Sequence, residues 1–136
     1  MAPLIKIDVV AAVILNDAQE ILIAKRLPTA TSGDLWEFPG GKIEKDETHL
    51  AALSRELAEE LGIQITHAEP WMSFNYDYSD RHIFLNMWIV KKFLGEPFGR
   101  EGQLIRWTRY ENLDQFPFLQ ANQQVIGLLR SLFLII

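Results

Sequence analysis

Three glutamates, Glu56, Glu59 and Glu60, stand at positions i, i+3 and i+4 of a helix-forming segment. At about 100° per residue this spacing places the carboxylates on one helical face. Like charges at these spacings destabilise a helix by about 0.2–0.5 kcal/mol per pair, and the dipole disfavours negative charge in the last turn. A solvated acidic face, partly neutralised by Arg55, is one interpretation.

A binding site for a hard cation is the other interpretation of this acidic face. Mg²⁺ prefers oxygen ligands in octahedral geometry and keeps several waters. Carboxylates on a rigid helix, together with backbone carbonyls from the neighbouring Gly40-Gly41 turn, supply such ligands and leave positions open for substrate phosphates. The helix alone is compatible with both interpretations.

The elements that must position this face follow from the hydrophobic pattern. A helix is predicted over residues 47–61, with Asp46 or Thr48 as its N-cap and Gly62 at its end. Its apolar stripe consists of leucines at spacings of three and four, namely Leu50, Leu53, Leu57 and Leu61. The carboxylates therefore lie beside a buried stripe.

Strands are predicted where β-branched and aromatic residues concentrate or alternate with polar ones: residues 5–15, 21–25, 71–78, 82–93 and 104–108. Residues 16–19 form a turn between the first two strands. A second helix is predicted over residues 121–134, with Val125, Ile126, Leu129 and Leu132 facing inward. Strands and helices mix without regular alternation, which favours an α+β fold.

Composition limits the class of protein. The chain has 136 residues, which suits one domain, and its net charge of -5 argues against a nucleic-acid coat protein. It has no cysteine, which excludes disulfides and thiol chemistry. No apolar run reaches the roughly 18 residues of a membrane span, and the first 15 residues are predicted to be a strand rather than a signal peptide. We expect a cytoplasmic protein.

One long motif resolves the choice between the two interpretations. Gly41, five residues, Glu47, seven residues and then the run of residues 55–63, RELAEELGI, resemble the Nudix box at every fixed position. The similarity continues through residues 37–43, 80–82, 95–97, 99–103 and 121–122. Over nearly the whole chain the sequence looks most like the MutT-type branch of this family, the 8-oxo-dGTP diphosphatases.

The resemblance implies one Nudix domain over residues 1–136, an α/β/α sandwich with a mixed sheet between helices. It also implies hydrolysis of a nucleoside triphosphate, 8-oxo-dGTP above all, to the monophosphate and pyrophosphate. The implied cofactor is Mg²⁺, with Mn²⁺ as an expected substitute. The implied metal ligands are the carbonyl of Gly40 and the carboxylates of Glu56, Glu59, Glu60 and Glu101.

The implied catalytic residues are Glu56, Arg55 and Glu101. Glu56 is favoured as the group that orients or deprotonates the attacking water, and Glu101 is its rival, because sequence cannot place either carboxylate against the water. Arg55 orients the neighbouring carboxylates and Glu47 supports that network.

The implied substrate-binding residues are Arg26, Glu37, Phe38, Pro39, Gly40, Arg81 and Asn122. Asn122 matches an asparagine that reads a purine, since an amide both donates and accepts hydrogen bonds. Its alternative role is to cap the C-terminal helix. Thr31 departs from the histidine that the prototype enzymes carry in this loop.

Two further hypotheses stay open. The first is a Nudix hydrolase for another nucleotide: a pyrimidine triphosphate, a dinucleoside polyphosphate or an ADP-sugar. Tyr76 and Tyr78 lie where polyphosphate-cleaving relatives carry a tyrosine, although they also suit strand packing. The second is a binding module that does not cut. The expected partner is a small nucleotide, with no nucleic-acid polymer and no membrane, and the expected state is a monomer.

Overall fold

The computed structural model describes residues 5–135 of the chain, and the side chains of residues 5–133. The strand and signal-peptide predictions for residues 1–4 lie outside this range. The elements, in chain order, are β1 (Ile5–Ile14), β2 (Ile21–Lys25), β3 (Trp36–Glu37), β4 (Gly40–Lys42), α1 (His49–Leu61), β5 (Gln64–Asp77), β6 (Arg81–Leu94), β7 (Ile105–Thr108), the 3₁₀ helix η1 (Tyr110–Gln115) and α2 (Gln120–Ile135).

The strands form two sheets. One is a four-stranded sheet in the order β4-β1-β6-β5, and the other is a three-stranded sheet in the order β3-β2-β7. β1 runs parallel to β6, and all other strand pairs are antiparallel. The turn after β1 brings Leu15 beside Ile21, which is the bridge between the two sheets.

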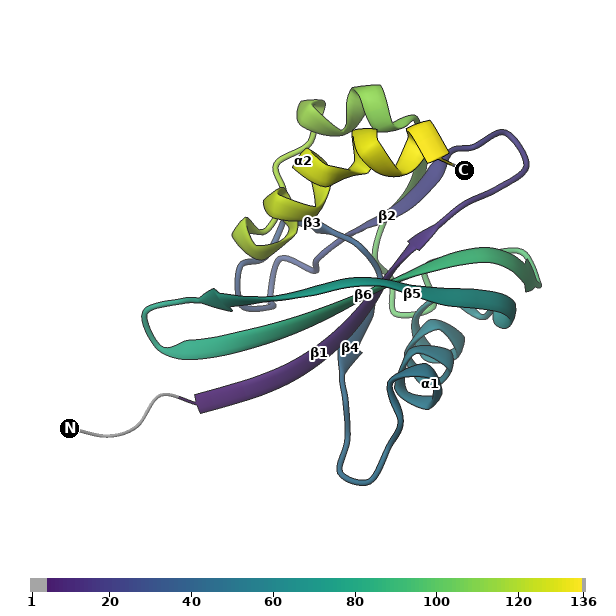
Figure 1. Ribbon diagram of the computed structural model, residues 1–136. Coiled ribbons are helices and arrows are strands. Elements are labelled where there is room, and N and C mark those ends of the chain that lie inside the picture. The colour runs from purple at the N-terminus through teal and green to yellow at the C-terminus, as the bar shows by residue number, and fades with distance from the viewer. Residues whose placement is uncertain (1–4, 136) are drawn as a thin grey trace.

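Helices α1 and α2 lie on opposite sides of the strands (Figure 1). The alternation of β1 explains this layering, because successive side chains of a strand point to opposite faces. Val10, Ala12 and Ile14 pack in the core layer of α1. Ala11, Val13 and Leu15 pack in the core layer of α2. The predicted α+β fold with a mixed sheet between helices is confirmed.

Helix α1 ends at Leu61 as predicted but begins at His49, two residues later than predicted, with Thr48 rather than Asp46 as its N-cap. The Thr48 hydroxyl accepts a hydrogen bond from the Ala51 N–H at 3.1 Å, and Gly62 ends the helix with a left-handed φ of 71°. Leu53, Leu57 and Leu61 are fully buried, and burial of each stabilises the fold by about 1.5–3 kcal/mol.

The prediction that Leu50 belongs to the buried stripe is wrong. This side chain is 41% exposed, and the buried positions of α1 start at Ala52. Leu50 has a suitable angular position, but it lies in the first turn of the helix, where residues 49–51 are all exposed. The strands do not cover that turn.

Strand β5 is longer than predicted, since it begins at Gln64 rather than at Trp71. Residues 64–70 pair with β6 although Pro70 lies among them, and the register shifts there mark irregular pairing. Backbone hydrogen bonds to β6 therefore define a strand that side-chain alternation does not show. The half-buried alternation of Phe74, Tyr76 and Tyr78 is confirmed.

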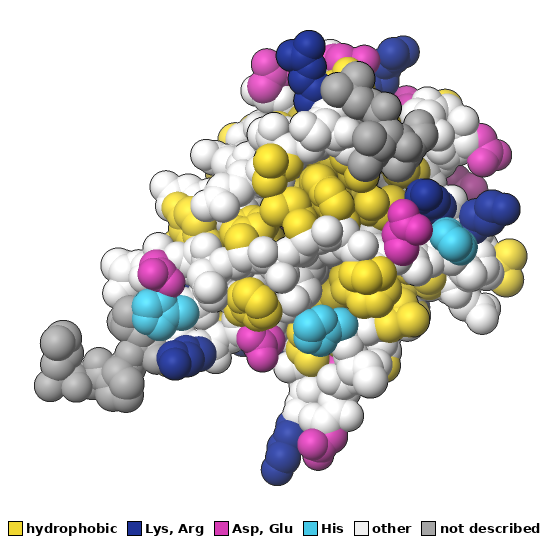
Figure 2. Space-filling view, viewed as in Figure 1, with side chains coloured by type: hydrophobic (Ala, Val, Ile, Leu, Met, Phe, Trp, Pro, Cys, Tyr) yellow, Lys and Arg dark blue, Asp and Glu magenta, His cyan; other side chains and the backbone are white. Residues whose placement is uncertain are grey.

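The second helix spans one residue more than predicted at each end. Val125, Leu129 and Leu132 are buried, and Ile126 is half-buried against the same core. Hydrophobic side chains gather in a band between α2 and the strands on one face of the molecule (Figure 2). Within residues 5–135 no helix has the length and apolarity needed to cross a bilayer.

Candidate active site

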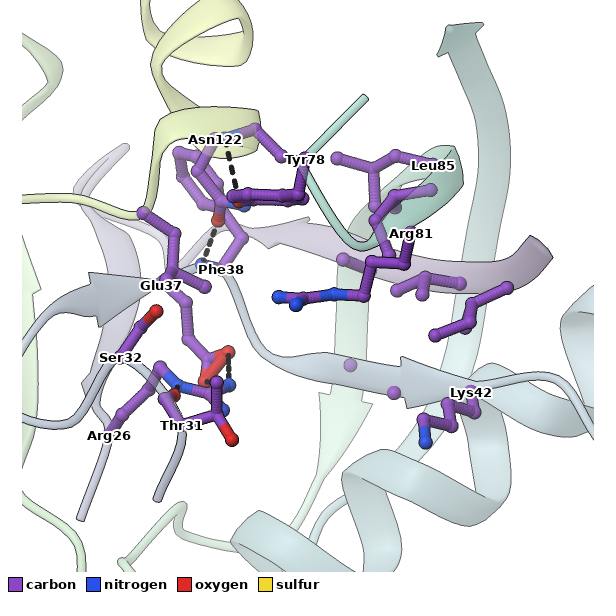
Figure 3. Close-up of a pocket in the computed structure, with 18 of the residues that line it drawn as sticks. Arg26, Thr31, Ser32, Glu37, Phe38, Lys42, Tyr78, Arg81, Leu85 and Asn122 are labelled. Atoms are coloured by element: carbon purple, nitrogen blue, oxygen red, sulfur yellow. Dashed lines mark hydrogen bonds and ion pairs between the residues drawn. The ribbon is translucent and has the colours of Figure 1, made fainter. Parts of the chain in front are cut away.

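A cavity of about 290 Å³ opens between β1, β4, the start of β6 and the N-terminus of α2 (Figure 3). Of the residues that the sequence assigns to a site, Arg26, Glu37, Phe38, Gly40, Glu60, Arg81 and Asn122 line it. A second cavity of about 180 Å³ is lined by Pro39 and Glu101. Arg26, Glu37 and Glu60 line both cavities, so they form the wall between them.

Asn122 closes one end of the larger cavity. Its Oδ1 accepts a hydrogen bond from the Phe38 N–H at 2.8 Å, and both residues are almost completely buried. Because α2 begins at Gln120, Asn122 lies inside the first turn, and no hydrogen bond from this side chain to a helix N–H is found among the described residues. The Asn122 amide group thus fixes α2 to the segment that precedes Gly40, and its NH₂ group remains available to a ligand.

The tip of the β5–β6 hairpin forms the wall beside Asn122. The Arg81 guanidinium lies over the Tyr78 ring, 4.4 Å from its centroid, and extends into the cavity (Figure 3). The Tyr78 hydroxyl accepts a hydrogen bond from the Ala121 N–H at 3.3 Å. A planar cation and a closed apolar corner therefore meet at this end, which suits a flat aromatic ligand.

Arg26 and Glu37 form a partly buried ion pair at 3.0 Å. Burial raises the pKa of Glu37, and the charge of Arg26 lowers it in part. Arg26 Nε also donates to the carbonyl oxygen of Thr31 at 2.9 Å. This contact uses the main chain, so it does not depend on the departure from histidine at position 31.

Glu60 is the most perturbed group of the wall. Burial, and then the negative charges of other carboxylates, raise its pKa to about 9. Its Oε2 atom is buried and has no hydrogen-bond partner among the described residues. A buried carboxylate oxygen without a partner is costly in a folded protein and calls for a positive ligand.

Glu56 lies against Gly41 of strand β4. A Cβ atom on Gly41 would lie 2.6 Å from both carboxylate oxygens of Glu56, so only glycine allows this approach. Burial raises the pKa of Glu56, and Arg55, paired with it at 2.9 Å, lowers it in part. The close packing fixes the Glu56 carboxylate beside the backbone of β4.

Arg55 holds this region together. Its Nε and Nη2 bind both oxygens of Glu47 at 2.8 and 2.9 Å, and Nη2 also donates to the Lys42 carbonyl at 3.0 Å. The Arg55 pairing lowers the pKa of Glu47 to about 2. Arg55 thus links Glu47 and the main chain of β4, and the orienting role of Arg55 and the supporting role of Glu47 stay predictions.

Glu59 and Glu101 lie further out than the other expected ligands. The Glu59 side chain is mostly exposed and lies 3.7 Å from Arg55. Glu101 is exposed on the loop before β7, yet its charge raises the pKa of Glu37, Glu56 and Glu60. The acidic side chains of the site therefore come from three segments that only the fold brings together: α1, the loop that carries Glu101 and β3, which carries Glu37.

The donor set fits a divalent cation. Oxygen ligands predominate, several carboxylates repel one another, and the Glu60 Oε2 lacks a partner. No three acidic or histidine side chains among the described residues are grouped closely enough to hold an ion as they stand. The ligand set stays a prediction: the Gly40 carbonyl and the carboxylates of Glu56, Glu59, Glu60 and Glu101 would hold the ion together with waters and phosphate oxygens, as Mg²⁺ prefers.

Alanine at position 41 tests the packing of Glu56. If Glu56 has its predicted catalytic role, we expect Gly41→Ala to lower kcat by about 10- to 100-fold, because moving a catalytic group by about an ångström has effects of this size. The new methyl group meets the end of a flexible side chain, so the melting temperature changes little.

Gly127→Ala is the matched control, since a Cβ there meets nothing within 4 Å. In the middle of α2 it stabilises the fold by about 0.5–1 kcal/mol and leaves kcat unchanged. Steady-state kinetics measure kcat, and thermal melts measure the melting temperature, of Gly41→Ala and Gly127→Ala. Equal kcat for the two would contradict the position of Glu56 against β4.

Sequence reasoning did not assign Lys42 or Tyr78 to the site, although both line the larger cavity. Lys42 directly follows the glycine pair, and a cation beside the place expected for substrate phosphates was the available signal. Tyr78 carried a weaker signal, because strand packing explained its alternation equally well.

Comparisons with known proteins show the family of the chain. A model of the NUDIX domain family matches residues 10–128. A protein of Escherichia coli K12 named 8-oxo-dGTP diphosphatase is 40% identical over 127 residues, which cover 93% of this chain and 98% of that protein. A second E. coli K12 protein, named CTP pyrophosphohydrolase, is 42% identical over 116 residues and 85% of each chain.

Solved structures give the same result. A MutT structure from work on Aliivibrio salmonicida and Vibrio cholerae superimposes with a TM-score of 0.80 at 38% identity, over 90% of this chain and 94% of that one. The solution structure of the E. coli ORF135 protein superimposes with a TM-score of 0.82 at 39% identity, over 95% and 91%.

Proposed function

The chain belongs to the Nudix hydrolase family, and we propose that it hydrolyses 8-oxo-dGTP to the monophosphate and pyrophosphate. The observation that carries this proposal is the arrangement of one cavity, with a closed, amide-bearing corner at one end and repelling carboxylates at the other. Relatives named 8-oxo-dGTP diphosphatase, from Escherichia coli and from Haemophilus influenzae at 39% identity, support the substrate.

The chemistry follows from the carboxylate end. Water attacks one of the two phosphorus atoms that flank the α–β bridging oxygen, the bond from that phosphorus to the bridging oxygen breaks, and the water gives up a proton as the monophosphate and pyrophosphate separate. When bound, a divalent cation neutralises phosphate charge and lowers the pKa of the attacking water. We propose Mg²⁺, with Mn²⁺ as a substitute. Nudix enzymes generally need such a divalent ion.

We assign the role of general base to Glu56. One of its oxygens accepts from Arg55, which fixes the carboxylate while the other oxygen takes the proton of the attacking water. Its raised pKa lies closer to neutral pH than the pKa of an ordinary glutamate, which makes the carboxylate a better proton acceptor. Glu101 is exposed on its loop and is assigned to the cation instead.

The closed corner supports recognition of an oxidised purine. An 8-oxoguanine base presents the O6 acceptor beside the N7–H donor. The Asn122 NH₂ group donates to O6, and the second lone pair of its Oδ1 accepts from N7–H. Phe38 packs beneath the base, and Arg81 stacks on it as a planar cation. Arg26 and Lys42 contact the phosphates.

A panel of nucleotides tests the proposal. 8-oxo-dGTP, dGTP, dCTP, CTP, a dinucleoside polyphosphate and ADP-ribose are compared by kcat/KM with Mg²⁺, and the products are identified. A large preference for 8-oxo-dGTP with release of pyrophosphate is the expected result. A preference for CTP, which the relative named CTP pyrophosphohydrolase makes the second candidate, would overturn the base assignment. Binding without turnover would overturn the enzyme assignment.

Asn122→Asp separates recognition from structure. Aspartate keeps the Oδ1 acceptor for the Phe38 N–H but loses the amide donor. We expect kcat/KM for 8-oxo-dGTP to fall by about 10- to 100-fold, the effect of an unpaired buried polar group. Asn112→Asp, the same change in an exposed residue of η1, leaves kcat/KM unchanged. An equal kcat/KM for 8-oxo-dGTP in Asn122→Asp and the unmodified protein would contradict the role of Asn122 in base recognition.

The remaining expectations stay predictions: one domain over residues 1–136, a monomer, and a cytoplasmic location. Size-exclusion chromatography with light scattering checks the oligomeric state.

A further inference from the structure

The loop between β6 and β7 is attached to the end of α1. The last carbonyl groups of a helix have no partner within the helix. Here the Leu61 carbonyl accepts from the Phe98 N–H at 3.1 Å, and the Glu60 carbonyl accepts from the Arg100 N–H at 3.0 Å. The Arg100 guanidinium donates to the Ala58 carbonyl at 2.8 Å. The loop that carries Glu101 is thus bound to the helix that carries the other carboxylates.

Gln103 makes a connection of a different kind. Its Nε2 donates to the Glu60 carbonyl at 3.0 Å, and its Oε1 accepts from the Glu101 N–H at 2.9 Å. One side-chain amide therefore joins the main chains of two acidic residues. Both residues, and Gln103 itself, line the smaller cavity.

Residues 99–103 form a tight turn, which the Gln103 side chain bridges. Gly102 has a φ of +86° and its N–H donates to the Gly99 carbonyl at 3.0 Å. A Cβ on Gly99 would lie 3.2 Å from Gln103 Oε1. Without the Gln103 amide, the described contacts leave the Glu101 N–H with no partner, and Glu101 is exposed. Phe98 and Arg100 hold the loop before Glu101 to α1, and Gln103 is the side chain that links the Glu101 N–H itself to the Glu60 carbonyl.

We infer that Gln103 is a positioning residue that holds Glu101 at the carboxylate site opposite Glu60. It acts on the cation site through Glu101 and touches neither the substrate nor the reacting atoms. The inference rests on the proposed function for the identity of the site. Residues that orient metal ligands in this way typically change metal affinity by about 10- to 100-fold when removed.

Cation affinity in the absence of nucleotide is the direct test. The free Mn²⁺ signal in electron paramagnetic resonance gives the Kd of the unmodified protein and of Gln103→Met, which has the same length but no amide. We expect the Kd to rise about 10-fold or more in Gln103→Met. Gln123→Met is the matched control, because it removes a side-chain bond to the Phe118 carbonyl far along the chain from Glu101. Its Kd stays unchanged.

A double-mutant cycle shows whether Gln103 acts through Glu101. Glu101→Gln, Gln103→Met and the double variant are compared by Mn²⁺ Kd and by kcat against KM. We expect the double variant to match Glu101→Gln, since a positioning residue has nothing left to position. Additive losses, or a Kd for Gln103→Met equal to that of the unmodified protein, would overturn the inference. So would an unmodified protein that does not bind Mn²⁺.

Gln103→Asn is the second variant if Gln103→Met does not fold. It keeps the amide but is one methylene too short to reach both main chains, so the same loss of Mn²⁺ affinity is expected. The cycle measured by Mn²⁺ binding is independent of the nucleotide. If the protein hydrolyses no nucleotide but the Mn²⁺ Kd values of the cycle are non-additive, the proposed function is contradicted and the positioning role of Gln103 still holds.

Discussion

Glu56→Gln is expected to lower kcat with Mg²⁺ by about 10³- to 10⁴-fold, at the upper end of the range for a lost general base. Glutamine keeps the shape of the side chain and its contact with Arg55, but it cannot take a proton from water. Because burial raises the pKa of Glu56, the charged form destabilises the fold near pH 7, so the neutral variant melts at the same or a higher temperature without metal.

Glu44→Gln is the control for this experiment. Glu44 is exposed and lies 3.8 Å from Arg55, so the variant removes a charge beside the same guanidinium without touching the site. Its kcat stays within about 2-fold of the unmodified protein, as expected of an exposed ion pair. A large fall in the melting temperature of Glu56→Gln would show a structural role instead. A kcat near that of the unmodified protein would transfer the base role to Glu101.

The second large effect concerns Glu60 and pH. A carboxyl group with a raised pKa in the folded protein holds its proton there more tightly than in the unfolded chain. The folded state therefore binds more protons between pH 4.5 and about 9, and stability falls as the pH rises through this window. At about 1.4 kcal/mol per pH unit, the loss between pH 5 and pH 7 is roughly 2–3 kcal/mol in the absence of metal.

Glu60→Gln is expected to remove most of this pH dependence. Urea denaturation in EDTA at pH 5, 6, 7 and 8 measures the slope for both proteins. Added Mg²⁺ stabilises the unmodified protein at pH 8 and has less effect on the variant, because a ligand stabilises only the state that binds it. Glu111→Gln, an exposed carboxylate on η1, keeps the slope of the unmodified protein. If Glu60→Gln kept the same dependence of stability on pH, the raised pKa of buried Glu60 would be contradicted.

Local patterns along the chain determined the larger elements of the fold. The apolar spacing of Leu53, Leu57 and Leu61, with Thr48 before it and Gly62 after it, specifies helix α1 because capping and periodicity are properties of neighbouring residues. Its first turn was the exception, since the exposure of Leu50 depends on how far the strands extend. The start of β5 depends likewise on its pairing with β6.

The sequence by itself also determined the family chemistry, because the Nudix box is a run of contiguous residues with fixed spacing. It did not determine how the residues outside the box meet that motif. Phe38 and Asn122 are 84 residues apart and share a hydrogen bond, and the charge of Glu37 on β3 raises the pKa of Glu60 on α1. Burial, the raised pKa of Glu60 and the bridge made by Gln103 arise only when distant segments pack together, since desolvation and hydrogen-bond geometry are properties of the folded chain.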